Sequence, residues 1–200
     1  MDSHEVRRGW AERSGEYSPA YYAYYGPDER SETVHSLVDE YAGPDASVLE
    51  LGCSSGRHLA YLADEGYDDL AGVEVNPDAF DVMDEEYPDL ADSGTFYCDA
   101  IEDVVGDLAD GRFDVVFSVE TLQHIHPDAE WVFGELARVA GELLVTVENE
   151  GDDGDDVSYV NDDFPLYHRN WRTVFEGVGL EQVAATEGKR DTVRAFRPSA

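Results

Sequence analysis

The segment SVLELGCSSGRHL, residues 47–59, decides the fold. Its first five residues are apolar enough to predict a buried strand that ends at Gly52. Small residues follow, and they let the backbone turn sharply and approach a ligand closely. They are Gly52, Ser54, Ser55 and Gly56. A helix predicted over residues 56–65 points its free N–H groups into this turn, which favours an anionic group there.

The rest of the chain repeats this order of strand and helix. Apolar runs predict seven strands, at residues 47–51, 70–75, 94–98, 113–119, 142–147, 180–186 and 192–196. Helical spacing and stop signals predict helices at 31–41, 56–65, 77–86, about 101–109, 127–139 and 169–178. Near-continuous apolar strands that alternate with helices indicate a parallel sheet covered on both faces.

The end of the chain departs from the parallel pattern. Only EGKRD, residues 187–191, joins the last two strands, which is too short for a parallel crossover. The predicted fold class is therefore α/β: a doubly wound, mostly parallel seven-stranded sheet with a C-terminal antiparallel hairpin and helices on both faces. We assign residues 31–200 to this domain. Residues 1–30, polar and aromatic, are predicted to form an arm or lid.

Composition narrows the class of protein. The chain has 200 residues and 42% hydrophobic content, which suffices for one domain with a real core. The chain has no apolar run long enough for a membrane-spanning helix, and its first ten residues, MDSHEVRRGW, do not form a secretory signal. We therefore expect a cytoplasmic protein without a membrane segment. Its two cysteines, Cys53 and Cys98, match no zinc spacing, and we expect no metal site.

The charge is extreme. Thirteen basic and 46 acidic residues give a formal net charge of −33. In ordinary salt such self-repulsion opposes the compact state and repels nucleic acid, so no nucleic-acid partner is expected. This composition resembles that of cytoplasmic proteins from extreme halophiles, since molar salt shortens the Debye length to about 3 Å. The acidic run 150–156 is predicted to be a solvated loop.

Two further acids stand where strands end. Glu74 closes the second predicted strand, about 20 residues after the glycine turn, where a carboxylate can accept both hydroxyl protons of a ribose. Asp99 follows the third strand. The alternatives are structural: Glu74 as an acid at a helix N-terminus and Asp99 as a cap.

These residues together resemble the class I S-adenosylmethionine-dependent methyltransferases. The family's first motif, acid-x-G-x-G-x-G, is matched by Glu50 to Gly56, with Ser54 in place of the middle glycine. Glu74 and Asp99 match its second and third acids, and FDVVFSVETLQHIHP, residues 113–127, matches its fourth motif. The resemblance covers about residues 31–197 and implies a Rossmann-like seven-stranded sheet.

The resemblance implies S-adenosylmethionine as the cofactor. The turn N–H groups would meet its carboxylate, and Glu50 would order the loop or hold its amino group. Glu74 would bind the ribose, Asp99 the adenine amino group, and Ile101 would pack on the ring. The predicted cofactor-binding residues are Glu50, Gly52, Cys53, Ser54, Gly56, Glu74, Val75, Asp99, Ala100, Ile101, Ser118 and Val119.

The acceptor side offers fewer signals. His124 and Glu120 follow the fourth strand and are the candidate catalytic residues, His124 as a base for a hydroxyl or amine and Glu120 near the methionine end. His126 is a second candidate base. The alternatives are a helix-cap or surface histidine and a solvated loop acid.

Other side chains have two interpretations each. The tyrosines of the arm would either stack on an acceptor or pack as amphipathic residues. They are Tyr17, Tyr21, Tyr22, Tyr24 and Tyr25. Arg169 would hold an anionic substrate or pair with a neighbouring acid. Cys53 is expected to fill space in the turn and Cys98 to lie in the core.

The function predicted is methyl transfer to O, N or C of a small-molecule acceptor. A protein or RNA acceptor, and a non-catalytic module that binds S-adenosylmethionine, are the alternatives. An NAD(P)-dependent oxidoreductase is disfavoured because the chain lacks G-x-G-x-x-G. The sequence leaves the oligomeric state open.

Overall fold

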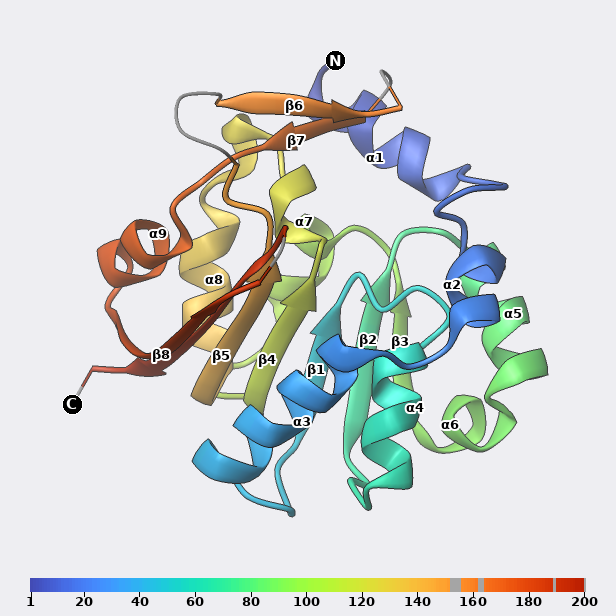
Figure 1. The fold of residues 1–200 in the computed structure, drawn as a ribbon, viewed down its shortest axis with the longest axis horizontal. Coiled ribbons are helices and arrows are strands. Elements are labelled where there is room, and N and C mark those ends of the chain that lie inside the picture. Colours follow the sequence, from blue (N-terminus) through green and yellow to red (C-terminus); the bar gives the residue numbers. More distant parts are fainter. Residues whose placement is uncertain (152–155, 162–163, 189, 200) are drawn as a thin grey trace.

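The computed structural model describes every residue except 152–155, 162–163, 189 and 200. Its main sheet has seven strands in the order β3-β2-β1-β4-β5-β9-β8 (Figure 1). Strands β1 to β5 pair in parallel, whereas β9 is antiparallel to β5 and β8. The strands are β1 Val48–Leu51, β2 Leu70–Glu74, β3 Thr95–Cys98, β4 Phe113–Val119, β5 Ala140–Glu148, β8 Leu180–Glu187 and β9 Thr192–Pro198. The predicted mixed sheet with its C-terminal hairpin is confirmed.

Helices cover both faces of this sheet, as predicted. One core cluster joins it to α3 Glu29–Tyr41, α4 Arg57–Asp64, α5 Asp78–Glu86 and α6 Pro88–Ser93. The other joins it to α7 Ile101–Val104, α8 Val132–Val139 and α9 Trp171–Gly177. Successive strand side chains serve opposite faces, so Val115 and Phe117 pack in the first cluster and Val116 in the second.

The first 28 residues form two helices that the sequence did not predict. Helix α1, Ser3–Ala11, starts at a capping box between Asp2 and Glu5. Helix α2, Pro19–Tyr25, starts at Ser18 with proline at its first position. Figure 1 shows this arm passing over the end of the sheet, with α1 beside a small second sheet.

That second sheet is another correction to the prediction. Strands β6, Val157–Val160, and β7, Phe164–Tyr167, pair antiparallel above the carboxyl ends of the main strands (Figure 1). Pro165 lies within β7, and proline argues against a strand in a sequence pattern. The acidic run 150–156 falls partly outside the described residues, at 152–155.

Three further predictions need correction. The helix expected at about 101–109 is only α7 followed by a 3₁₀ turn, Val105–Asp107, because Gly106 weakens the helix. The helix expected at 127–139 begins as a 3₁₀ turn, Pro127–Ala129, before α8. Cys98 is exposed rather than buried, since β3 is an edge strand. Within the described ranges, no helix is long and apolar enough to cross a membrane.

Candidate functional site

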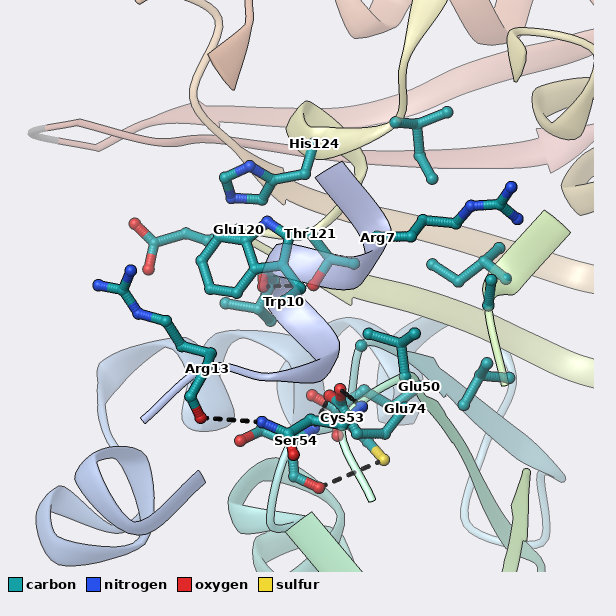
Figure 2. A pocket seen from close by; sticks show the side chains of 18 of the residues that line it. Arg7, Trp10, Arg13, Glu50, Cys53, Ser54, Glu74, Glu120, Thr121 and His124 are labelled. Carbon is teal, nitrogen blue, oxygen red and sulfur yellow. Dashed lines mark hydrogen bonds between the residues drawn. The ribbon is translucent and has the colours of Figure 1, made fainter. Parts of the chain in front are cut away.

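A cavity opens at the carboxyl ends of β1, β2 and β4, under the arm. It spans roughly 1090 Å³ of space free of atoms, its open mouth included. Strand order reverses around β1, which has β2 on one side and β4 on the other, and open α/β sheets bind ligands at such a point. In Figure 2, Glu50 and Glu74 lie toward one end of the cavity and His124 toward the other, with Trp10 between them.

The turn after β1 has the sharp backbone that its sequence predicts. Gly52, Ser54 and Gly56 have φ of 69°, 50° and 84°, all in the left-handed region. Ser54 therefore adopts the conformation for which the family motif places glycine. A Cβ on Gly56 would lie 2.8 Å from Leu90 Cδ2, so a side chain at this position would force Leu90 to move and would strain the backbone at its positive φ.

Glu50 is a buried carboxylate with an unused oxygen. It is 1% exposed, it lines the cavity, and its Oε2 has no hydrogen-bond partner among the described residues. Burial raises the pKa of Glu50 well above its usual value, an effect that the Arg57 guanidinium opposes. An orphaned carboxylate oxygen in a cavity wall fits a ligand that brings a cationic donor, such as an ammonium group.

Glu74 joins the turn after β1 to the end of β2. Its Oε2 accepts from the Ser54 N–H at 2.9 Å and its Oε1 from the Asn76 N–H at 2.7 Å. Burial raises the pKa of Glu74, and these two backbone hydrogen bonds oppose the increase. Each oxygen retains acceptor capacity for a hydroxyl group of a ligand.

The other predicted cofactor residues divide into two groups. The cavity wall includes Cys53, Val75, Asp99, Ala100, Ile101 and Val119. Asp99 is exposed, and its Oδ1 accepts from the Ala100 N–H at 2.8 Å, which is the capping geometry considered as its alternative. Gly56 and Ser118 do not line the cavity. Ser118 is fully buried and its hydroxyl donates to Glu148. Alternation along β4 explains why Val119, its neighbour, does line it.

The loop after β4 brings both candidate catalytic residues to the cavity. Glu120 has φ of 51°, and its carboxylate lies 3.6 Å from the Arg30 guanidinium. Burial and the nearby Asp191 charge raise the pKa of Glu120, although Arg30 opposes them. This acid is therefore a stronger base than an exposed glutamate.

His124 is held in one orientation. Its Nδ1 lies 3.0 Å from the Pro165 carbonyl oxygen, which can only accept, so Nδ1 carries the proton and Nε2 is the free acceptor. Its ring lies 4.6 Å from that of Trp10 (Figure 2). Burial lowers the pKa of His124 to about 4, which keeps the ring neutral at neutral pH.

The remaining candidates mostly have structural contacts. His126 accepts from the Asp128 N–H at 3.2 Å, so it is a cap, although it reaches the cavity edge. Arg169 binds Glu130 at 3.2 Å and the Ile125 carbonyl oxygen at 2.8 Å, as its alternative anticipated.

The tyrosines of the arm divide into partly buried and exposed members, and Tyr21 packs against other tyrosines of the arm. Tyr17 and Tyr22 line the cavity, whereas Tyr24 and Tyr25 are exposed. Burial, together with the Glu120 charge, raises the pKa of Tyr22 to about 12, so its phenol stays protonated.

The cavity residues that were not predicted from the sequence include Trp10, Arg13 and Arg57. Trp10 and Arg13 come from the end of α1 and the turn after it, and Arg13 O accepts from the Asn76 side chain at 3.1 Å. Arg57 donates from Nη1 to the Gly26 carbonyl oxygen and to Asp28, both at 3.2 Å. The capping signals around Asp2 and Ser18 would have indicated the helices, but not that the arm covers the sheet. Among the described residues, no cluster of three metal-ligating side chains is found.

Comparison with known proteins gives relatives of this chain. Residues 48–142 match the family described as "Methyltransferase domain". A rice protein (Oryza sativa subsp. japonica) named probable tocopherol O-methyltransferase, chloroplastic, is 32% identical over 117 residues, which are 56% of this chain and 31% of that protein. The chain spans about a third to a half of the length of the curated relatives it matches.

Solved structures share its fold over nearly the whole chain. The 1,6-didemethyltoxoflavin-N1-methyltransferase of Burkholderia thailandensis, solved with 1,6-didemethyltoxoflavin and S-adenosylhomocysteine, has a TM-score of 0.77 at 14% identity, over 100% of this chain and 92% of that one. The magnesium protoporphyrin IX methyltransferase of Synechocystis, with bound S-adenosylmethionine, has a TM-score of 0.69 at 17% identity, covering 100% and 98%. At these identities the similarity is one of fold.

Proposed function

We propose that the chain is a class I S-adenosylmethionine-dependent methyltransferase, which methylates an O, N or C atom of a small-molecule acceptor. The match of residues 48–142 to the methyltransferase domain family and the similarity to the rice protein support this proposal. The observation that carries the proposal is the cavity itself. It gathers an orphaned buried carboxylate, a left-handed glycine turn and a second strand-end carboxylate at the reversal of strand order.

The chemical groups of the cavity suit the parts of the cofactor. We assign Glu50 to its ammonium, the N–H groups of the turn at the start of α4 to its carboxylate, and Glu74 to its ribose hydroxyls. Asp99 is assigned to the adenine amino group, beside the apolar wall of Ala100 and Ile101. When bound, S-adenosylmethionine supplies an electrophilic methyl carbon, and its sulfonium sulfur leaves as a neutral thioether.

The protein's own contribution to transfer is positioning and exclusion of water. Arm residues Trp10, Tyr17 and Tyr22 line the cavity opposite the sheet and shield the reacting groups from solvent. Where the acceptor carries a proton, His124 Nε2 or the Glu120 carboxylate takes it. Glu120 is the stronger of the two bases, because burial raises the pKa of Glu120 and lowers that of His124.

A small acceptor suits both the enclosure and the charge. The cavity lies under α1 and the turn after it, and such an enclosed site suits a small molecule better than a polymer. A net charge of −33 opposes binding to RNA. The relatives named above act, by their names, on small molecules, which favours the same class here.

Isothermal titration calorimetry in 2 M KCl is the test. We expect micromolar binding of S-adenosylmethionine and S-adenosylhomocysteine and no binding of NADH. Folded protein that binds neither sulfur compound would refute the proposal. Production of S-adenosylhomocysteine from S-adenosylmethionine with a fractionated pool of metabolites then separates an enzyme from a non-catalytic binding module, and fractionation identifies the acceptor.

A further inference from the structure

Glu148, the last residue of β5, is a fully buried carboxylate that the sequence does not single out. Its Oε1 accepts from the Ser118 hydroxyl at 2.7 Å, the Leu122 N–H at 3.0 Å and the Thr121 N–H at 3.1 Å. Its Oε2 accepts from the Gln123 N–H at 3.3 Å. Four donors from one short segment therefore converge on this one side chain.

These contacts cap a turn from outside its own sequence. Residues Leu122–His124 form a 3₁₀ turn, and its preceding residue, Thr121, provides no side-chain cap. The first N–H groups of such a turn need acceptors, and a negative charge there is favourable. Glu148 supplies both the acceptor oxygens and the negative charge. A further hydrogen bond, from the Asn149 N–H to Gln123 Oε1 at 2.9 Å, also joins the end of β5 to this turn.

The capped loop carries the two candidate catalytic residues. Glu120 and His124 flank the capped N–H groups and line the cavity, whereas Glu148 does not. We infer that Glu148 is a positioning residue, which fixes the loop of residues 119–124 and thereby sets where Glu120 and His124 meet the acceptor. The contact with an acceptor rests on the proposed function, whereas the positioning of the loop does not.

A carboxylate is needed for this task rather than an amide. Burial of its charge is costly and raises the pKa of Glu148 to about 7, yet the four donors offset much of that cost. A glutamine has one acceptor oxygen, and its NH₂ group would face N–H donors that it cannot satisfy. The neighbouring charged and titratable groups are His124 and Arg169. Burial lowers the pKa of the Arg169 guanidinium, and the negative charge of Glu148 raises it.

Histidine NMR measures this positioning without any acceptor. The variants are Glu148→Gln, Glu148→Asp and Ser118→Ala, with Glu142→Gln as the matched control, because Glu142 is an exposed acid on the same strand. His124→Asn identifies the His124 signal. In Glu148→Gln we expect the pKa of His124 to rise from about 4 by one pH unit or more, because a loosened loop exposes the ring to water. This loss of burial outweighs the loss of the Pro165 hydrogen bond, which by itself would lower the pKa. Ser118→Ala should cause a smaller rise, and Glu148→Asp should partly restore the native value.

The outcomes separate the two proposals. If Glu148→Gln does not fold by circular dichroism, Ser118→Ala and Glu148→Asp decide the matter. A His124 pKa equal to that of the native protein in folded variants overturns the inference, as does an equal shift in Glu142→Gln. A shift in His124 in a protein that binds no S-adenosylmethionine supports positioning and refutes the proposed function.

Discussion

The main-chain N–H of Ser54 donates to the Glu74 carboxylate at 2.9 Å, although the two residues belong to different strand ends. This bond holds Ser54 at its positive φ of 50° and keeps the turn after β1 beside the end of β2. Glu74 is therefore part of the scaffold of the turn as well as a candidate ligand for ribose.

Glu74→Ala should weaken the binding of S-adenosylmethionine by about 10- to 100-fold, the usual effect of removing a charged hydrogen-bond partner. The variant also leaves two backbone N–H groups unpaired, at Ser54 and Asn76. Calorimetry in 2 M KCl measures the affinity. Glu85→Ala, at an exposed position on α5, is the matched control and should bind normally. Unchanged affinity in Glu74→Ala would remove the ribose assignment.

His124→Asn should change how stability depends on pH. Above about pH 6.5 the ring is neutral in both folded and unfolded chains. As the pH falls toward 4, only the unfolded chain takes up this proton, because burial lowers the folded pKa of His124 to about 4. The free energy of unfolding then falls by about 3 kcal/mol through this residue. The His124→Asn variant should not lose this part of its free energy of unfolding as the pH falls.

Urea unfolding at pH 7 and pH 4.5, in 2 M KCl, measures the difference. The stability gap between native protein and His124→Asn should shrink at the lower pH. His4→Asn, at an exposed position, is the control and should keep a constant gap. An unchanged gap for His124→Asn would show that the ring protonates freely in the folded state.

Arg57→Ala should loosen the arm. The guanidinium donates to Gly26 O and Asp28 and lies 5.0 Å from the Tyr22 ring, so it joins α4 to the end of the arm. Hydrogen exchange of residues 1–28 should become at least about 10-fold faster. Each tenfold increase in the exchange rate corresponds to a free energy of local opening that is about 1.4 kcal/mol lower. Arg172→Ala, an exposed arginine paired with Glu176, is the control. Equal exchange in both variants would contradict this role.

Salt should stabilise the whole chain. The net charge of −33 means that acidic side chains repel one another throughout the chain. This repulsion acts over about 10 Å at 0.1 M salt and over only a few ångströms in molar salt. We expect Tm in 2 M KCl to exceed Tm in 0.1 M KCl by roughly 10 °C. NaCl at equal ionic strength should act alike if screening is the cause. A Tm that does not depend on salt would contradict the halophilic interpretation.

The sequence predicted the main sheet because its strands are apolar on both faces and its helices begin and end at clear signals. The placement of Glu50, Glu74 and Asp99 in the cavity wall was predictable because these residues stand at or beside strand ends. Their position relative to the sheet follows from local sequence and the rules of α/β topology alone.

Glu148 and Arg57 escaped the sequence analysis for a different reason. In a chain with 46 acidic residues, one more glutamate after a strand looks like surface charge. The role of Glu148 arises only when β5 brings it beside N–H groups some 26 residues away. Arg57 likewise gains its partners from Gly26 and Asp28, whose placement depends on how the arm packs. Contacts of this kind are tertiary, so no local pattern encodes them.

The position of β9 inside the sheet bears on how the chain is made. Strand β9, Thr192–Pro198, lies between β5 and β8, so the hydrogen-bonding edge of β5 stays open until these residues leave the ribosome. Strands β1 to β5 and the arm can assemble around the cavity before then. A chain synthesised only as far as β8 therefore has a bare edge on β5, and pairing of that edge with a neighbouring chain competes with its pairing to β9.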